Sequence, residues 1–217
     1  MSKQLSFSSI RFKDLKDLVP IEQTADSAIF KDWFNFDYEF QEEELVFLNE
    51  LIQRNRLRVN SYTEEELKAK FIIPLLNKVD FVYEDISDWY ERPIKGQIGG
   101  VDLGGVTDFM VAKGIKEPEI PYFFIQEFKP SKPSVFPEDQ LLAELMVSLN
   151  LNKQTYIKGG YLVGQFWTFA VLEKLEEGGY LFHLSESFDS LKLEDVKEIY
   201  VNLKAVKQEI IARNATK

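Results

Sequence analysis

The 217-residue sequence contains no cysteine and only one histidine, His183. Without cysteine the chain can form no disulfide, thiolate zinc site or thiol nucleophile. A Ser-His-Asp triad would depend on His183 alone, and its place in an apolar, strand-like run favours a structural histidine. Any catalysis is therefore expected to use carboxylates, lysine and a hard metal ion that prefers oxygen ligands.

Long apolar segments are also missing. No run reaches the roughly 18 apolar residues of a membrane-spanning helix, so no membrane contact is expected. The first residues show neither an apolar segment nor a cleavage site, so we expect no signal peptide and a cytoplasmic location. Hydrophobic residues make up 45% of the chain, which is enough for the core of one domain.

Positive charge is scarce, because the formal net charge is −10. This balance counts against a free-standing nucleic-acid binder, since the phosphate backbone attracts positive surface. The densest basic run is Arg54-Asn-Arg56-Leu-Arg58, and further lysines occur at 129, 132, 153 and 158. A local basic patch and an ordinary solvated surface are both compatible with this pattern.

The first 60 residues are expected to form an N-terminal extension that packs on a domain of residues 61–217. Strict alternation over Phe34–Phe40 predicts a half-buried strand, which could be a partner surface but is more typical of core. Leucine spacing then predicts a helix over 42–56.

The next helix is predicted to begin at Thr63, which forms a capping box with Glu66. Its apolar stripe, extended back by one turn, reaches Glu64, so Glu64 is the glutamate most expected to face inward. The alternative is that all three glutamates at 64–66 only cap the helix.

Short strands are predicted at 81–83, 89–90, 106–112 and 122–129, with the glycines at 96–105 in hairpin turns. A helix over 138–149, a hairpin over 160–172, a strand over 180–184 and a helix over 193–212 follow. The order of elements predicts an α/β fold with a mixed sheet.

Asp108 and the pair Glu127 and Lys129 interrupt two of these apolar strands. Glu127 and Lys129 project from the same face, because side chains alternate along a strand. Asp108 and Glu127 could share a divalent cation if their carboxylates lie within about 8 Å of each other. Taken alone, Glu-x-Lys is equally compatible with a solvated ion pair on an edge strand.

These residues resemble the PD-(D/E)xK nuclease superfamily, which has a restriction-endonuclease-like fold. The likeness is greatest to the N-terminal nuclease domain of type I restriction motor subunits and its stand-alone relatives. Asp108 and Glu127-Phe-Lys129 match the motif, residues 63–76 resemble its opening helix, and 140–144 and 161–169 resemble the helix and hairpin that follow. Val106-Thr107 stands where the family often has a proline.

The resemblance implies a central mixed β-sheet flanked by helices and a nuclease that hydrolyses DNA phosphodiester bonds, in restriction, defence or repair. Asp108, Glu127 and the carbonyl of Phe128 would ligate Mg²⁺ or Mn²⁺. Lys129 would orient or deprotonate the attacking water.

The resemblance also assigns roles to two helical residues. Glu64 would approach a second metal through water, and Gln140 would hold water or phosphate. An inactive module of the same fold, which binds a protein partner or forms a homo-oligomer, is the alternative.

Overall fold

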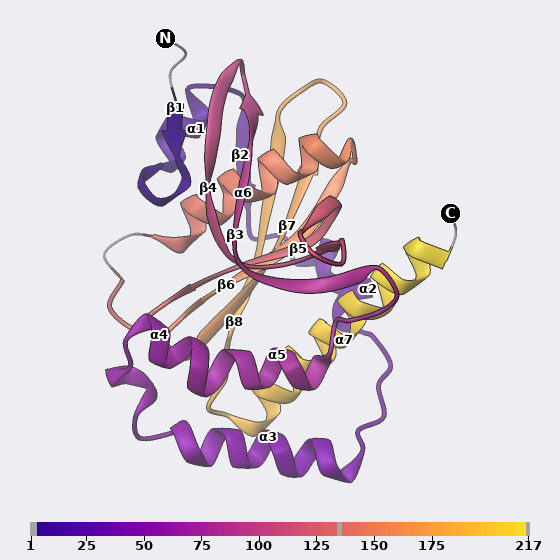
Figure 1. The fold of residues 1–217 in the computed structure, drawn as a ribbon. Helices are drawn as coiled ribbons and strands as arrows, with labels where there is room; N and C mark the ends of the chain where they lie inside the picture. Colours follow the sequence, from indigo (N-terminus) through magenta and orange to yellow (C-terminus); the bar gives the residue numbers. More distant parts are fainter. Residues whose placement is uncertain (1–3, 134–135, 216–217) are drawn as a thin grey trace.

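The computed structural model describes residues 4–133 and 136–215. It confirms the α/β class with a central mixed sheet flanked by helices (Figure 1). The strands are β1 (Gln4–Ser6), β2 (Ile21–Thr24), β3 (Ile86–Ile98), β4 (Val101–Lys113), β5 (Glu119–Lys129), β6 (Tyr156–Val163), β7 (Phe166–Lys174) and β8 (Tyr180–Asp189). The helices are η1 (Phe7–Ser9), α1 (Phe12–Lys16), η2 (Ala28–Phe30), α2 (Lys31–Phe34), α3 (Glu42–Asn55), η3 (Val59–Ser61), α4 (Glu64–Leu67), η4 (Lys68–Ile72), α5 (Ile73–Val79), α6 (Pro137–Asn152) and α7 (Leu193–Ala215).

The sheet runs in the order β1-β4-β5-β6-β7-β8-β2, and β3 forms a long hairpin with β4. The pairs β5–β6, β1–β4 and β2–β8 are parallel, whereas the hairpins are antiparallel. Because β1 and β2 occupy opposite ends of this order, the first 24 residues contribute to both ends of the sheet.

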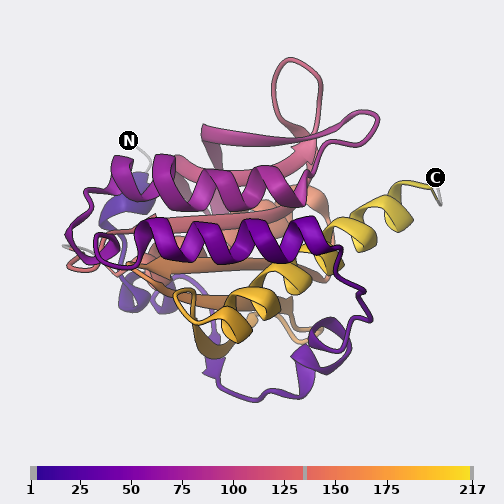
Figure 2. The same cartoon turned by 90° about the horizontal axis from the view of Figure 1, so that it is seen from below.

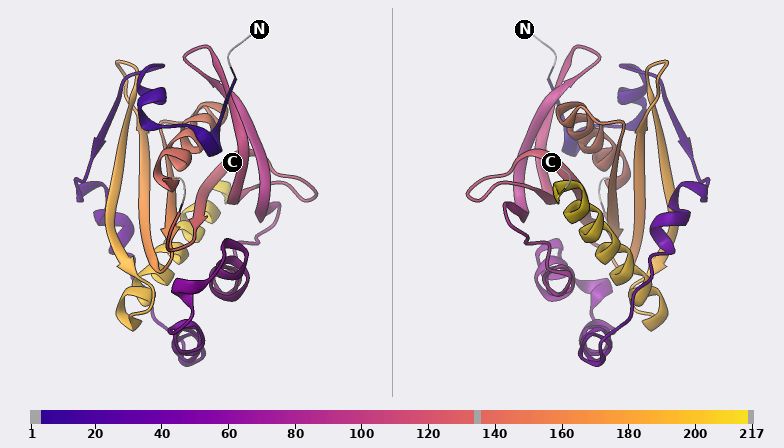
Figure 3. Two further views of the ribbon diagram at one scale, coloured as in Figure 1. Left: turned by 90° about the vertical axis from the view of Figure 1, so that its left-hand side faces the viewer. Right: turned by 90° about the vertical axis from the view of Figure 1, so that its right-hand side faces the viewer.

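Helix α6 lies in the concave side of the sheet, with β3 and β4 on one side of it and β7 and β8 on the other (Figure 3). Its residues from Gln140 to Leu149 are all buried. Gly159 of β6 allows this close packing, because a Cβ there would lie 3.0 Å from Leu145 Cδ2 and 2.8 Å from the carbonyl oxygen of Ile125.

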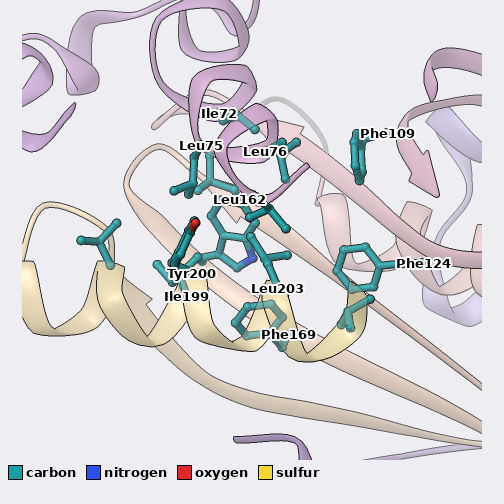
Figure 4. Close-up of a cluster of buried hydrophobic side chains, with 14 of the residues drawn as sticks. Ile72, Leu75, Leu76, Phe109, Phe124, Leu162, Phe169, Ile199, Tyr200 and Leu203 are labelled. Carbon is teal, nitrogen blue, oxygen red and sulfur yellow. The ribbon is translucent and has the colours of Figure 1, made fainter. Parts of the chain in front are cut away.

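The other face of the sheet is covered by α7 and the helix formed by α4, η4 and α5, and α3 packs against these helices (Figure 2 and Figure 3). Figure 4 shows how side chains of α5, α7 and the strands interlock there. Each fully buried large side chain contributes about 1.5–3 kcal/mol to folding. The labelled members of this cluster are Ile72, Leu75, Leu76, Phe109, Phe124, Leu162, Phe169, Ile199, Tyr200 and Leu203.

The helix that begins at Glu64 contains a π-helical segment, η4, just before Pro74. Proline has no N–H to donate to the carbonyl four residues earlier, which is that of Lys70. The buried Asn55 at the end of α3 donates to this carbonyl instead, with Nδ2 3.3 Å from Lys70 O. The capping box of Thr63 and Glu66 is present as predicted.

Three local predictions are wrong. Phe34 ends α2, and residues 35–41 form no strand; their half-buried aromatic rings pack against the core. Residues 81–83 precede the strand, which begins at Ile86. Only Gly99 and Gly100 form the predicted hairpin turn, whereas Gly96, Gly104 and Gly105 lie inside β3 and β4.

None of the helices among the described residues is both long enough and apolar enough to cross a membrane.

Candidate functional site

Strands β4 and β5 bring Asp108 and Glu127 together on the face of the sheet that α6 covers. The backbone N–H of Asp108 donates to Glu127 Oε1 at 3.2 Å, and the N–H of Phe128 donates to Asp108 Oδ2 at 2.8 Å. Each carboxylate is therefore fixed by the strand that carries the other one. This reciprocal bonding sets the orientation of both groups without help from a loop.

The ammonium group of Lys129 marks the point on which these oxygens converge. Its Nζ lies 3.3 Å from Glu127 Oε2, 3.4 Å from Asp108 Oδ2 and 3.1 Å from the carbonyl oxygen of Phe128. The two carboxylate oxygens can be no farther apart than the sum of their distances from that nitrogen. They therefore lie closer than the separation of about 8 Å beyond which a shared cation is ruled out.

Glu64 and Lys68 reach the same site from the helix that Thr63 caps. Glu64 Oε2 lies 3.7 Å from Lys129 Nζ, and Lys68 Nζ donates to Asp108 Oδ1 at 2.7 Å. Glu64 is thus the inward glutamate, while Glu66 forms the capping box.

Gln140 lies one turn before Glu144 on α6 and donates to Glu144 Oε1 at 3.1 Å. The Glu144 carboxyl in turn interacts with Glu127, and both side chains are fully buried. Gln140 is therefore connected to the site through Glu144. Among the described contacts it has none with Asp108 or Lys129.

Burial raises the pKa of Glu127 to about 8, and the charge of Asp108 adds to this effect. The pKa of Glu144 is raised well above its usual range by burial and by Glu127. Two carboxyl groups can bond to each other only if one of them carries a proton. The pair therefore holds at least one proton at neutral pH.

Asp108 behaves differently although it is also buried. Burial alone would raise its pKa, but Lys129, Lys68 and the N–H of Phe128 outweigh this effect and lower it. Burial would lower the pKa of Lys129, yet the charges of Glu127, Asp108 and Glu64 raise it. The site at rest is thus an ionised aspartate between two ammonium groups, with a protonated pair behind it.

The donor set fits a hard divalent cation. Asp108, Glu127 and the carbonyl of Phe128 supply three oxygens that already surround one cationic group, and such oxygens are the preferred ligands of Mg²⁺. Within residues 4–133 and 136–215, no three histidine, cysteine, aspartate or glutamate side chains form a preformed metal site. A cation would therefore have to displace Lys129 from its oxygens.

Sequence reasoning missed three residues, namely Lys68, Glu91 and Glu144. Glu144 had a visible signal, because Gln140, Glu144 and Ser148 form a polar stripe at four-residue spacing on an otherwise apolar helix. Glu91 had none, since its position depends on a positive φ of 52° inside β3.

His183 lies on β8, where Nε2 is 2.7 Å from Glu173 Oε2. It has no described contact with the residues of the site.

No family model matches the chain, and a comparison with curated proteins gives no significant match.

Proposed function

We propose that the chain is a metal-dependent nuclease of the PD-(D/E)xK type that hydrolyses phosphodiester bonds in DNA. The observation that carries this proposal is the convergence of Asp108 Oδ2, Glu127 Oε2 and Phe128 O on the Nζ atom of Lys129. Two carboxylates, a carbonyl and a lysine, next to the last pair of β4 and β5 (Phe109 with Gln126), form the set that the motif requires.

Asp108, Glu127 and the carbonyl of Phe128 would hold Mg²⁺ or Mn²⁺, which supplies positive charge to the phosphate and acidifies a bound water. Lys129 is an ammonium group here, because its neighbouring carboxylates raise its pKa. It therefore acts as a hydrogen-bond donor that orients the water and stabilises charge on the phosphoryl oxygens. Gln140 acts indirectly, since it positions Glu144 behind Glu127.

The basic run of the sequence supports a nucleic-acid substrate despite the acidic chain. Arg54, Arg56 and Arg58 are exposed at the end of α3. The next segment contains Asn60, whose Oδ1 accepts from Ser131 Oγ at 3.0 Å, and Ser131 is two residues beyond Lys129. This contact brings the segment after the basic run next to the segment after Lys129, so Arg56 and Arg58 are candidates for phosphate contacts, whereas Arg54 is already paired with Glu50.

The rival proposal, an inactive binding module, would be supported by the acidic surface and by an aromatic partner surface at 34–40. The rings of Phe34, Phe36, Tyr38 and Phe40 are only half-exposed and pack against the core, and the Phe40 ring stacks on Tyr200 at 6.0 Å. This segment offers little apolar surface to a partner, so we favour the nuclease.

Cleavage of DNA by wild type and by Lys129→Ala tests the proposal. With Mg²⁺ or Mn²⁺ we expect wild type to cut, and we expect the variant to lose at least about a hundredfold in rate, the usual cost of removing one positioned donor that stabilises transition-state charge. Lys116→Ala, an exposed lysine in the β4–β5 turn, is the matched control and should keep full activity. Cleavage that survives in a folded Lys129→Ala protein, checked by thermal unfolding, would refute the assignment.

A further inference from the structure

The ammonium group of Lys68 is surrounded by three carboxylates from three different elements. Its Nζ lies 2.7 Å from Asp108 Oδ1, 2.7 Å from Glu91 Oε1 and 3.0 Å from Glu64 Oε1. The Lys68 side chain is only 16% exposed. An ammonium group has three donors, so these three acceptors use all of them.

The backbone around Lys68 holds this arrangement in place. In β3, Tyr90 pairs with Phe109 and Arg92 pairs with Thr107, so Glu91 lies opposite Asp108. Its positive φ of 52° is an unusual backbone conformation for a residue other than glycine, and such conformations concentrate at functional sites. Lys68 itself begins the π-helical segment, another feature common at functional sites.

The two oxygens of Asp108 serve two separate cations. Oδ2 faces Lys129 and the N–H of Phe128, which is the side of the proposed metal ligands. Oδ1 faces Lys68. In two-metal phosphodiesterases a carboxylate often joins two divalent ions in this way, and the second ion stabilises charge on the phosphate.

We infer that Lys68 is a built-in replacement for the second divalent cation, so that the chain binds one metal ion at this site. This inference rests on the proposed function. Because all three donors of Lys68 are occupied, it acts as a fixed charge that positions Asp108 and offsets part of the negative charge of Glu64 and Glu91. It is a positioning residue and makes no bond to the substrate.

The number of Mn²⁺ ions bound by the intact chain tests the inference, measured by electron paramagnetic resonance and by calorimetry without substrate. We expect one ion in wild type and two in Lys68→Met, because the three carboxylates then lack their cation. Lys68→Arg should keep one ion. Lys70→Met, which removes an exposed lysine paired with Glu66 on the same helix, is the matched control and should also keep one.

Two ions in wild type would overturn the inference and leave the nuclease proposal intact. A single ion in a folded Lys68→Met protein would overturn it in the same way. If wild type binds no Mn²⁺, the metal-dependent function fails and the inference fails with it. Should Lys68→Met not fold, the wild-type count decides alone, since one ion supports the inference and two overturn it.

Discussion

The proton shared by Glu127 and Glu144 can be tested by Glu144→Gln. Glutamine has the size of glutamate, and its carbonyl can accept from Gln140 Nε2 as Glu144 Oε1 does at 3.1 Å. Its amide nitrogen can donate to the Glu127 carboxylate, where the wild-type pair needs a proton. We therefore expect Glu127 to ionise at lower pH in the variant.

The size of the effect on the free energy of unfolding follows from the linkage between proton binding and folding. The pKa of Glu127 is raised to about 8, whereas an unfolded glutamate ionises near ~4.3. Between these values the folded state binds more protons than the unfolded state, so the free energy of unfolding falls as pH rises. One proton corresponds to about 1.4 kcal/mol per pH unit, and the effect is larger where both carboxyl groups are protonated in the folded state.

Urea denaturation with a chelator, at several values between about pH 5.5 and about pH 7.5, measures this difference. Wild type should lose stability relative to Glu144→Gln as pH rises, by on the order of 3 kcal/mol over that range. Glu176→Gln makes the same substitution at an exposed turn and should run parallel to wild type. If wild type and Glu144→Gln are also parallel, the shared proton does not exist.

Two further substitutions test the helix that carries Glu64 and the basic run near the site. Thr63→Ala removes the cap of the helix that carries Glu64, and should lower the free energy of unfolding by about 1 kcal/mol in urea; an unchanged value would show that the box is not formed. Replacing Arg54, Arg56 and Arg58 by glutamine should make the slope of log K for DNA binding against log salt concentration shallower by about 0.9 for each lost phosphate contact. An unchanged slope would show that these arginines do not contact the DNA.

Helices were largely predictable because their signals are local. The capping box at Thr63 and the leucine spacing of α3 need only neighbouring residues, and both elements begin where expected. The two short strands before residue 25 were not predicted, since each gains its hydrogen bonds from a partner far away in the chain. The alternation of aromatic and polar residues over 34–40 predicted half-burial correctly, but a strand also needs a neighbouring strand to pair with, and this segment has none in the described structure.

The site was predictable only in part. Strand periodicity predicts that Glu127 and Lys129 share a face, and Asp108 stands out because it interrupts an apolar strand. Lys68 could not be identified, because its contacts depend on how a helix end lies against two strands. Glu91 requires a backbone conformation that its sequence does not signal.

The pairing of β2 with β8 also determines when the sheet can be completed. Ile21 pairs with Tyr180, so a strand made early in synthesis has no partner until most of the chain has left the ribosome. Contacts between residues so distant in sequence slow folding, because the chain loses entropy on closing the loop before the two strands gain their hydrogen bonds. Until β2 and β8 pair, both have an edge open to other chains, and removal of the first 24 residues would leave the outer edge of β8 open permanently.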